Sequence, residues 1–275
     1  MRLRSVFIIP PSGEGLDAAL ESAADAINLT LADDSVAVGT LRRAAEAAIP
    51  RIREAGKLAI VTVNHPRTQL LRDDIDAIVM DGLSAVFLSH ATEPQDCRDL
   101  AVLLREFEYG RGIEPGTVKV FPVIDSARGL MRAYEIAQSV PRIGGLVYSA
   151  RGYARDIGAR EEEVGPRLAY ARGAVVAAAR AVDALPLVSA GSLQLQFLAQ
   201  HGFAGALVSD AMSAAGANTY FTPNFGARER AERLSAAYDA ARAEGAWVGR
   251  SQGELADAAA ARKARQVLEH FEGEV

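Results

Sequence analysis

Short apolar runs recur along the chain, and amphipathic segments separate them. The runs are five to eight residues long and end in polar or turn-forming residues, which is typical of strands inside a sheet. The segments between them, such as Leu41–Glu54 and Glu229–Glu244, have the apolar spacing of helices. The predicted strands are Ser5–Pro10, Ala26–Leu31, Leu58–Asn64, Ala85–His90, Val118–Asp125, Gly145–Ala150, Leu185–Ala190 and Ala206–Asp210.

Strands that alternate with helices predict a parallel sheet, and eight such units in 275 residues predict a closed (β/α)₈ TIM barrel of the α/β class. We expect residues 1–226 to form the barrel core. Residues 227–275 are expected to supply the last barrel helix, Ala227–Glu244, and an appended helix, Glu254–Phe271. No linker rich in glycine, proline or serine divides the chain, so a single domain is expected overall.

The bulk composition narrows the class of protein. The chain is 49% hydrophobic and 24% charged, which is typical of a globular protein with a large core. A net charge of −5 and a pI near 5.5 argue against nucleic-acid and anionic-membrane partners. The only cysteine, Cys97, excludes an intrachain disulfide. The sequence shows neither a secretory signal nor a membrane-spanning run, so we expect a cytoplasmic protein.

Candidate chemistry lies where the predicted strands end, because the carboxyl ends of barrel strands form the active face of this fold. The strand Val118–Asp125 is central, since it is strongly apolar and ends on a carboxylate. Three acids at strand ends could share a divalent cation, although aspartate there also caps the following helix. The polar strand-end residues are Ser12, Thr30, Asp33, Asn64, His90, Asp125, Ser149, Arg151, Ser189 and Asp210.

Two of these residues have both a functional and a structural interpretation. Asn64 could offer its amide to a substrate carbonyl or carboxylate, or it could hold the turn before Pro66. His90 could act as an acid or base near neutral pH, or serve as a hydrogen-bond partner only.

Lys119 opens its strand and is expected far from Asp125, which argues against a Schiff-base aldolase.

An ordered set of motifs resembles the HpcH/HpaI aldolase/citrate lyase superfamily, in particular the citrate lyase β-subunit. The resemblance runs from Arg4 to about Gly245. It implies carbon–carbon bond cleavage or formation in an acyl-CoA or a small oxo- or hydroxy-acid, with Mg²⁺ bound at the acids. It also implies a homo-oligomer, a trimer or hexamer, working beside other lyase subunits. The matching segments are Arg4–Pro10, Ala24–Ala26, Val61–Asn64, Val123–Gly129, Pro141–Gly158, His201–Gly205 and Asn218–Pro223.

The departures from that pattern concentrate at chemical positions. The resemblance places Asp125 where the family has a metal-binding glutamate. It places Gly152 at the second metal acid and Thr62 at the arginine that holds a substrate carboxylate. Asp125 could keep the metal with Asp156 as a second ligand, or Arg151 could pair with Asp125 and replace the metal.

Three hypotheses about function follow from these departures. The first is a divergent lyase that uses Asp125 and Arg151, with Asn64, His65, His90 and Ser149 available to bind substrate. The second is a catalytically inactive ligand-binding or assembly subunit. The third is a metal-free aldolase that uses His90 as its base.

Overall fold

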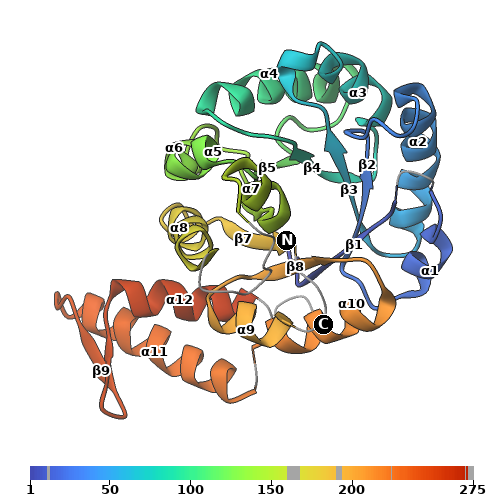
Figure 1. The fold of residues 1–275 in the computed structure, drawn as a ribbon. Coiled ribbons are helices and arrows are strands. Elements are labelled where there is room, and N and C mark those ends of the chain that lie inside the picture. Colours follow the sequence, from blue (N-terminus) through green and yellow to red (C-terminus); the bar gives the residue numbers. More distant parts are fainter. Residues whose placement is uncertain (11–12, 160–167, 190–193, 224, 270, 272–275) are drawn as a thin grey trace. The chain divides into compact units, whose positions relative to one another are not determined.

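A computed structural model describes residues 1–10, 13–159, 168–189, 194–223, 225–269 and 271. Eight parallel strands close into a barrel in the order β1 to β8, and β1 also pairs with β8 (Figure 1). The predicted TIM barrel is therefore confirmed. The strands are β1 (Ser5–Ile8), β2 (Ala26–Thr30), β3 (Leu58–Val63), β4 (Leu83–Leu88), β5 (Lys119–Ile124), β6 (Gly145–Tyr148), β7 (Leu185–Ser189) and β8 (Gly205–Val208).

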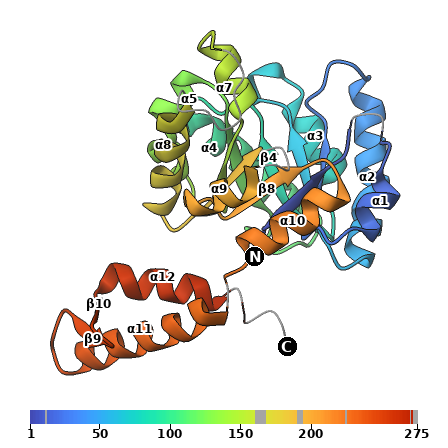
Figure 2. The ribbon, with the colours of Figure 1, turned by 60° about the horizontal axis from the view of Figure 1, so that its bottom comes forward.

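Helices follow the strands and surround the barrel (Figures 1 and 2). Most begin within a few residues of a strand's carboxyl end, so they hold the connecting loops at one face. They are α1 (Leu16–Glu21), α2 (Val38–Glu54), η1 (Pro66–Thr68), α3 (Leu71–Ile78), α4 (Pro94–Gly110), α5 (Ala127–Met131), α6 (Ala133–Ala137), α7 (Ala150–Asp156), α8 (Ala169–Arg180), α9 (Leu195–Gln200) and α10 (Ala211–Phe221).

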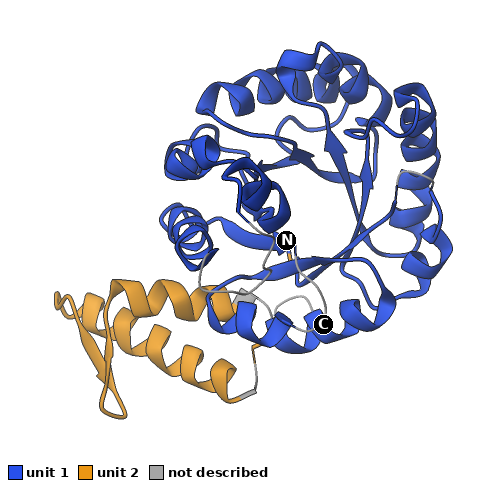
Figure 3. Cartoon of the chain, in the orientation of Figure 1, with its two compact units in different colours: residues 1, 3–221 blue, residues 2, 222–275 orange. Residues whose placement is uncertain are grey.

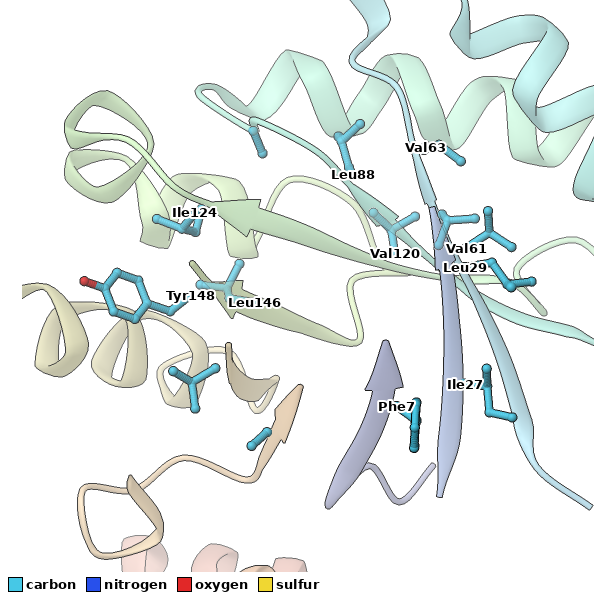
Figure 4. Packing of buried hydrophobic residues seen from close by; sticks show 14 of the residues in the cluster. Phe7, Ile27, Leu29, Val61, Val63, Leu88, Val120, Ile124, Leu146 and Tyr148 are labelled. Atoms are coloured by element: carbon cyan, nitrogen blue, oxygen red, sulfur yellow. The ribbon is translucent and has the colours of Figure 1, made fainter. Parts of the chain in front are cut away.

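Successive side chains of each strand point to opposite faces of the sheet, and both faces are buried. One set fills the barrel interior, where the rings of Phe87 and Phe121 meet edge to face at 5.6 Å. The alternate set packs under the helices and includes Val120, Ile124 and Tyr148 (Figure 4). This alternation fixes which polar residue at each strand end can face the mouth of the barrel.

The chain divides into two compact units, one of residues 1 and 3–221 and one of residues 2 and 222–275 (Figure 3). The helix after β8 is α10, whereas the segment Ala227–Glu244, expected as the last barrel helix, corresponds to α11 (Phe225–Ala243), which ends one residue earlier and belongs to the second unit. The reason is local packing, because Ala231 and Leu234 of α11 share a small core with residues further along the chain.

The second unit also contains an antiparallel hairpin that was not predicted from the sequence. It consists of β9 (Gly249–Ser251) and β10 (Glu254–Ala256), and α12 (Ala258–Glu269) follows it. Gln252 and Gly253 both have positive φ, 49° and 84°, which suits a two-residue hairpin turn. The helix predicted from Glu254 therefore starts four residues later.

Among the described residues, every helix is too short or too polar to cross a lipid bilayer.

Candidate functional site

Neutral polar side chains dominate the carboxyl-end mouth of the barrel. Continuing the inward-facing positions of β2 to β7 by steps of two reaches Asn28, Thr30, Thr62, Asn64, Ser89, Asp125, Ser149 and Ser189. Asn28 Nδ2 donates to Thr62 Oγ1 at 3.0 Å, and Thr62 Oγ1 donates to Asn28 Oδ1 at 3.2 Å. These two side chains therefore satisfy each other across β2 and β3.

The side chains of His90 and Asp125 contact each other at this mouth. The Nδ1 atom of His90 lies 2.6 Å from Oδ2 of Asp125. The Asp125 side chain is 9% exposed and that of His90 is 65% exposed, so the carboxylate is shielded while the imidazole faces solvent. His90 adopts a positive φ of 54°, which is uncommon for a residue with a side chain and places its ring beside the neighbouring strand end.

The pair alters the titration of the imidazole. The hydrogen bond to Asp125 raises the pKa of His90 above its ordinary value of 6.5, although partial burial and the positive charge of Arg155 oppose the shift. Arg155 lies on α7, so the first turns after β6 contribute to the electrostatics of this pair. Arg155 was not predicted from the sequence, because an arginine inside a surface helix gives no signal by itself.

Gly152 closes the space beside Asp125. A Cβ atom at Gly152 would lie 2.7 Å from Asp125 Cβ and 3.0 Å from Ser149 Oγ. Ser149 caps α7, because its Oγ accepts from Gly152 N at 3.2 Å. The start of α7 therefore packs directly against the base of Asp125, and a side chain at position 152 does not fit this backbone.

The other acids considered as metal ligands are engaged locally. Asp156 Oδ2 accepts from Ala127 N at 2.7 Å at the start of α5. Asp210 accepts from both Ser213 N and Ser213 Oγ, and Asp33 accepts from Ser35 in the same way. Hydrogen bonds to these serines lower the pKa of Asp33 and Asp210.

These acids do not fit a magnesium site built on paired carboxylates. Within the described ranges, no three histidine, cysteine, aspartate or glutamate residues are placed to hold a metal ion. Asp125 already contacts His90, and Gly152 leaves no room for a second acid beside it. Mg²⁺ needs near-octahedral oxygen ligands and is usually held by one or two carboxylates.

Asn64 and His65 mainly stabilise the loop after β3. Asn64 Nδ2 donates to Leu31 O at 3.0 Å and to the buried carboxylate of Asp74 at 2.8 Å. Both hydrogen bonds use the amide nitrogen of Asn64, and neither uses its amide oxygen. His65 Nε2 lies 3.2 Å from Asp96 Oδ2, and its Nδ1 accepts from Arg67 N.

The predicted site residues are thus brought together only in part. His90, Asp125 and Ser149 lie at one edge of the mouth, on the consecutive strand ends of β4, β5 and β6. Arg151 is exposed at the start of α7, and among the described residues the basic side chain that contacts Asp125 is His90 instead. Ser12 lies outside the described residues. Lys119 opens β5, at the end of the strand opposite Asp125, as predicted.

The eight-stranded parallel barrel, with a histidine–aspartate contact at the carboxyl ends of its strands, is an α/β barrel of the TIM type. The chain belongs to the HpcH/HpaI aldolase/citrate lyase family, whose model matches residues 9–217. The predicted family is therefore confirmed, and the protein is a member of a family of lyases.

Relatives match along almost the whole chain. The citrate lyase subunit β of Escherichia coli (strain K12) is 29% identical over 286 residues, covering 98% of this chain and 93% of that protein. The L-malyl-CoA/β-methylmalyl-CoA lyase of Rhodobacter capsulatus is 27% identical over 287 residues, covering 92% and 89%. The structure of CitE from Mycobacterium tuberculosis with magnesium, acetoacetate and coenzyme A has a TM-score of 0.66 at 20% identity, covering 98% and 97% of the two chains.

Proposed function

We propose that the protein is a carbon–carbon lyase for a small oxo- or hydroxy-acid or its coenzyme A thioester, with His90 as the proton-transfer group. The contact between His90 Nδ1 and Asp125 Oδ2 is the observation that supports this most strongly. Relatives that act on citrate or malyl-CoA support the substrate class. A carboxylate bound to one ring nitrogen orients a histidine and sets its tautomer.

Asp125 keeps a proton on Nδ1, so the lone pair lies on Nε2, on the side of the ring away from the carboxylate. His90 Nε2 takes the proton from a hydroxyl two carbons from the substrate carbonyl. The O–H electrons become a carbonyl, the carbon–carbon bond breaks, and its electron pair forms an enolate. The imidazolium then returns the proton to the enolate carbon, which regenerates neutral His90 and releases both products.

The positive charge that forms on His90 during cleavage is stabilised by its neighbour Asp125. The imidazolium and the enolate form in the same step, so the net charge of the reacting groups does not change. Asp125 stabilises the imidazolium, as its effect on the pKa of His90 indicates. Cleavage in this scheme needs no second acid at Gly152.

The turnover of the enzyme should rise with pH. The base must be neutral, so kcat/KM is expected to increase as the His90 imidazolium loses its proton, with a midpoint above 6.5 because Asp125 raises that pKa. Replacing Arg155 by glutamine removes an opposing positive charge and should move the midpoint higher still. Steady-state rates between pH 5 and 9 measure both midpoints. A rate that falls across this range would contradict the proposed base.

A substrate panel tests the proposed activity itself. Purified protein is mixed with 3-hydroxyacyl-CoA thioesters and with 4-hydroxy-2-oxo acids, in the presence of either EDTA or Mg²⁺, and the released carbonyl product is measured. We expect cleavage that persists in EDTA. Cleavage that appears only with Mg²⁺ would show that the proposed metal-independent chemistry is wrong.

The closed space at Gly152 supports a second candidate, a ligand-binding or assembly subunit without catalysis. The same panel separates the two candidates. Binding of a small acid, detected by calorimetry, without turnover on any panel member would favour the non-catalytic subunit. A homo-oligomer, a trimer or hexamer, and a cytoplasmic location also stay predictions.

A further inference from the structure

Three arginines gather around the carboxylate of Glu93, which lies on the same loop as His90. Arg67 Nη2 contacts Glu93 Oε1, and Glu93 Oε2 lies 3.4 Å from Arg128 Nη2 and 3.3 Å from Arg132 Nη1. The three guanidinium groups come from separate stretches, namely η1, α5 and the junction of α5 with α6. We call Arg67, Arg128 and Arg132 the arginine cluster.

Among the described residues, the arginine cluster has more positive charge than its acids neutralise. Arg132 also donates to Glu135 Oε2 at 3.0 Å, so within the described ranges three guanidinium groups face two carboxylates. The side chains of Arg67 and Arg128 are 65% and 63% exposed, and each contacts Glu93 through one terminal nitrogen. Each guanidinium carries further N–H donors besides the one that contacts Glu93, in the planar geometry that suits phosphate and carboxylate oxygens.

The loop between β4 and α4 joins the arginine cluster to the catalytic pair. His90 and Glu93 are three residues apart, so their backbones lie within about 10 Å of each other. Helix α5 packs against the middle of this loop, since a Cβ atom at Gly129 would lie 2.5 Å from Ala91 O. One short, tightly packed loop therefore fixes both groups on the same edge of the barrel.

We propose that the arginine cluster binds a phosphate group of the substrate, which places the reacting part of that molecule at His90. The proposal rests on the proposed lyase function and specifies its substrate as a phosphate-bearing one. Arginine pairs recognise phosphate through bidentate, charge-assisted hydrogen bonds. The phosphate could belong to the nucleotide part of a coenzyme A thioester or to a small phosphorylated acid.

Calorimetric titration distinguishes these sources without requiring turnover. Coenzyme A and 3-phosphoglycerate are each titrated into the wild type and into the Arg67→Gln and Arg128→Gln variants. We expect both variants to bind one of the two ligands at least tenfold more weakly, and the ligand affected identifies the source of the phosphate. Arg51→Gln is the matched control, because Arg51 is 52% exposed and pairs with the single acid Asp17.

Replacing Glu93 should have the opposite effect on the affinity for the ligand. Glu93→Gln removes the negative charge that holds the arginine cluster, so the same ligand should bind more tightly, while the amide oxygen can still accept the capping hydrogen bond at the start of α4. Ligand affinities within twofold of the wild type in both arginine variants would overturn the proposal, as would no binding of either ligand by the wild type. The Asp125→Asn variant should still bind, so a failure of the lyase chemistry remains distinguishable.

Discussion

Replacing Asp125 by asparagine is expected to lower kcat by about 10²–10⁴-fold, the usual contribution of a positioned acid or base. The amide has nearly the same shape but has no charge to stabilise the imidazolium. It can also present its NH₂ group to His90 Nδ1, which would favour the tautomer whose Nε2 cannot accept a proton. Stopped assays on the best substrate from the panel, at saturating concentration, measure this loss.

Asp156→Asn provides the discriminating comparison for that result. Asp156 lies on the same rim but its Oδ2 accepts from Ala127 N, so its replacement is expected to keep most of the activity. Thermal melts of both variants establish that each is folded. Equal losses of kcat in the two variants would point to a shared metal ligand set and would contradict the role proposed for the His90–Asp125 pair.

Gly152→Asp is expected to destabilise the protein by about 1–3 kcal/mol, the usual range for overpacking. The new Cβ would lie 2.7 Å from Asp125 Cβ, so either α7 or the end of β5 must move. The substitution puts an acid back at the position where the family resemblance places one, yet it should not create a magnesium site on this backbone. Urea unfolding measures the stability, and kcat with and without Mg²⁺ measures the activity.

Gly173→Ala is the matched control for the glycine substitution. Gly173 lies in α8, where a Cβ atom would meet nothing within 4 Å, and alanine favours helix more than glycine by about 1 kcal/mol. This variant should be as stable as the wild type or slightly more stable. A Gly152→Asp protein of wild-type stability whose turnover had become dependent on Mg²⁺ would show that the space beside Asp125 can hold a metal.

The barrel could be predicted from the sequence because its signal is repeated. Each strand is a short apolar run, each is followed by a helix, and closure of a parallel sheet then follows from the number of units. The hairpin of β9 and β10 had no such repetition. Its strands have three residues each, and β10 leads directly into the alanine-rich stretch that favours helix, so its residues were assigned to the predicted helix.

The site was predictable only as a set of strand ends. The order of the chain placed His90 and Asp125 on neighbouring strands, but their pairing depends on the positive φ of His90, which no spacing rule gives. The tight packing at Gly152 likewise depends on how closely α7 approaches β5. The binding of Asn64 to Asp74 was missed because that acid lies on α3, where it resembles an ordinary helix residue.

The tautomer and titration of His90 test the proposed mechanism most directly, and nitrogen NMR of the imidazole measures both. We expect neutral His90 to have its proton on Nδ1, and the ring to titrate above pH 6.5 in the wild type and at a lower pH in Asp125→Asn. A proton on Nε2, or a midpoint that the Asp125 substitution leaves unchanged, would contradict the mechanism.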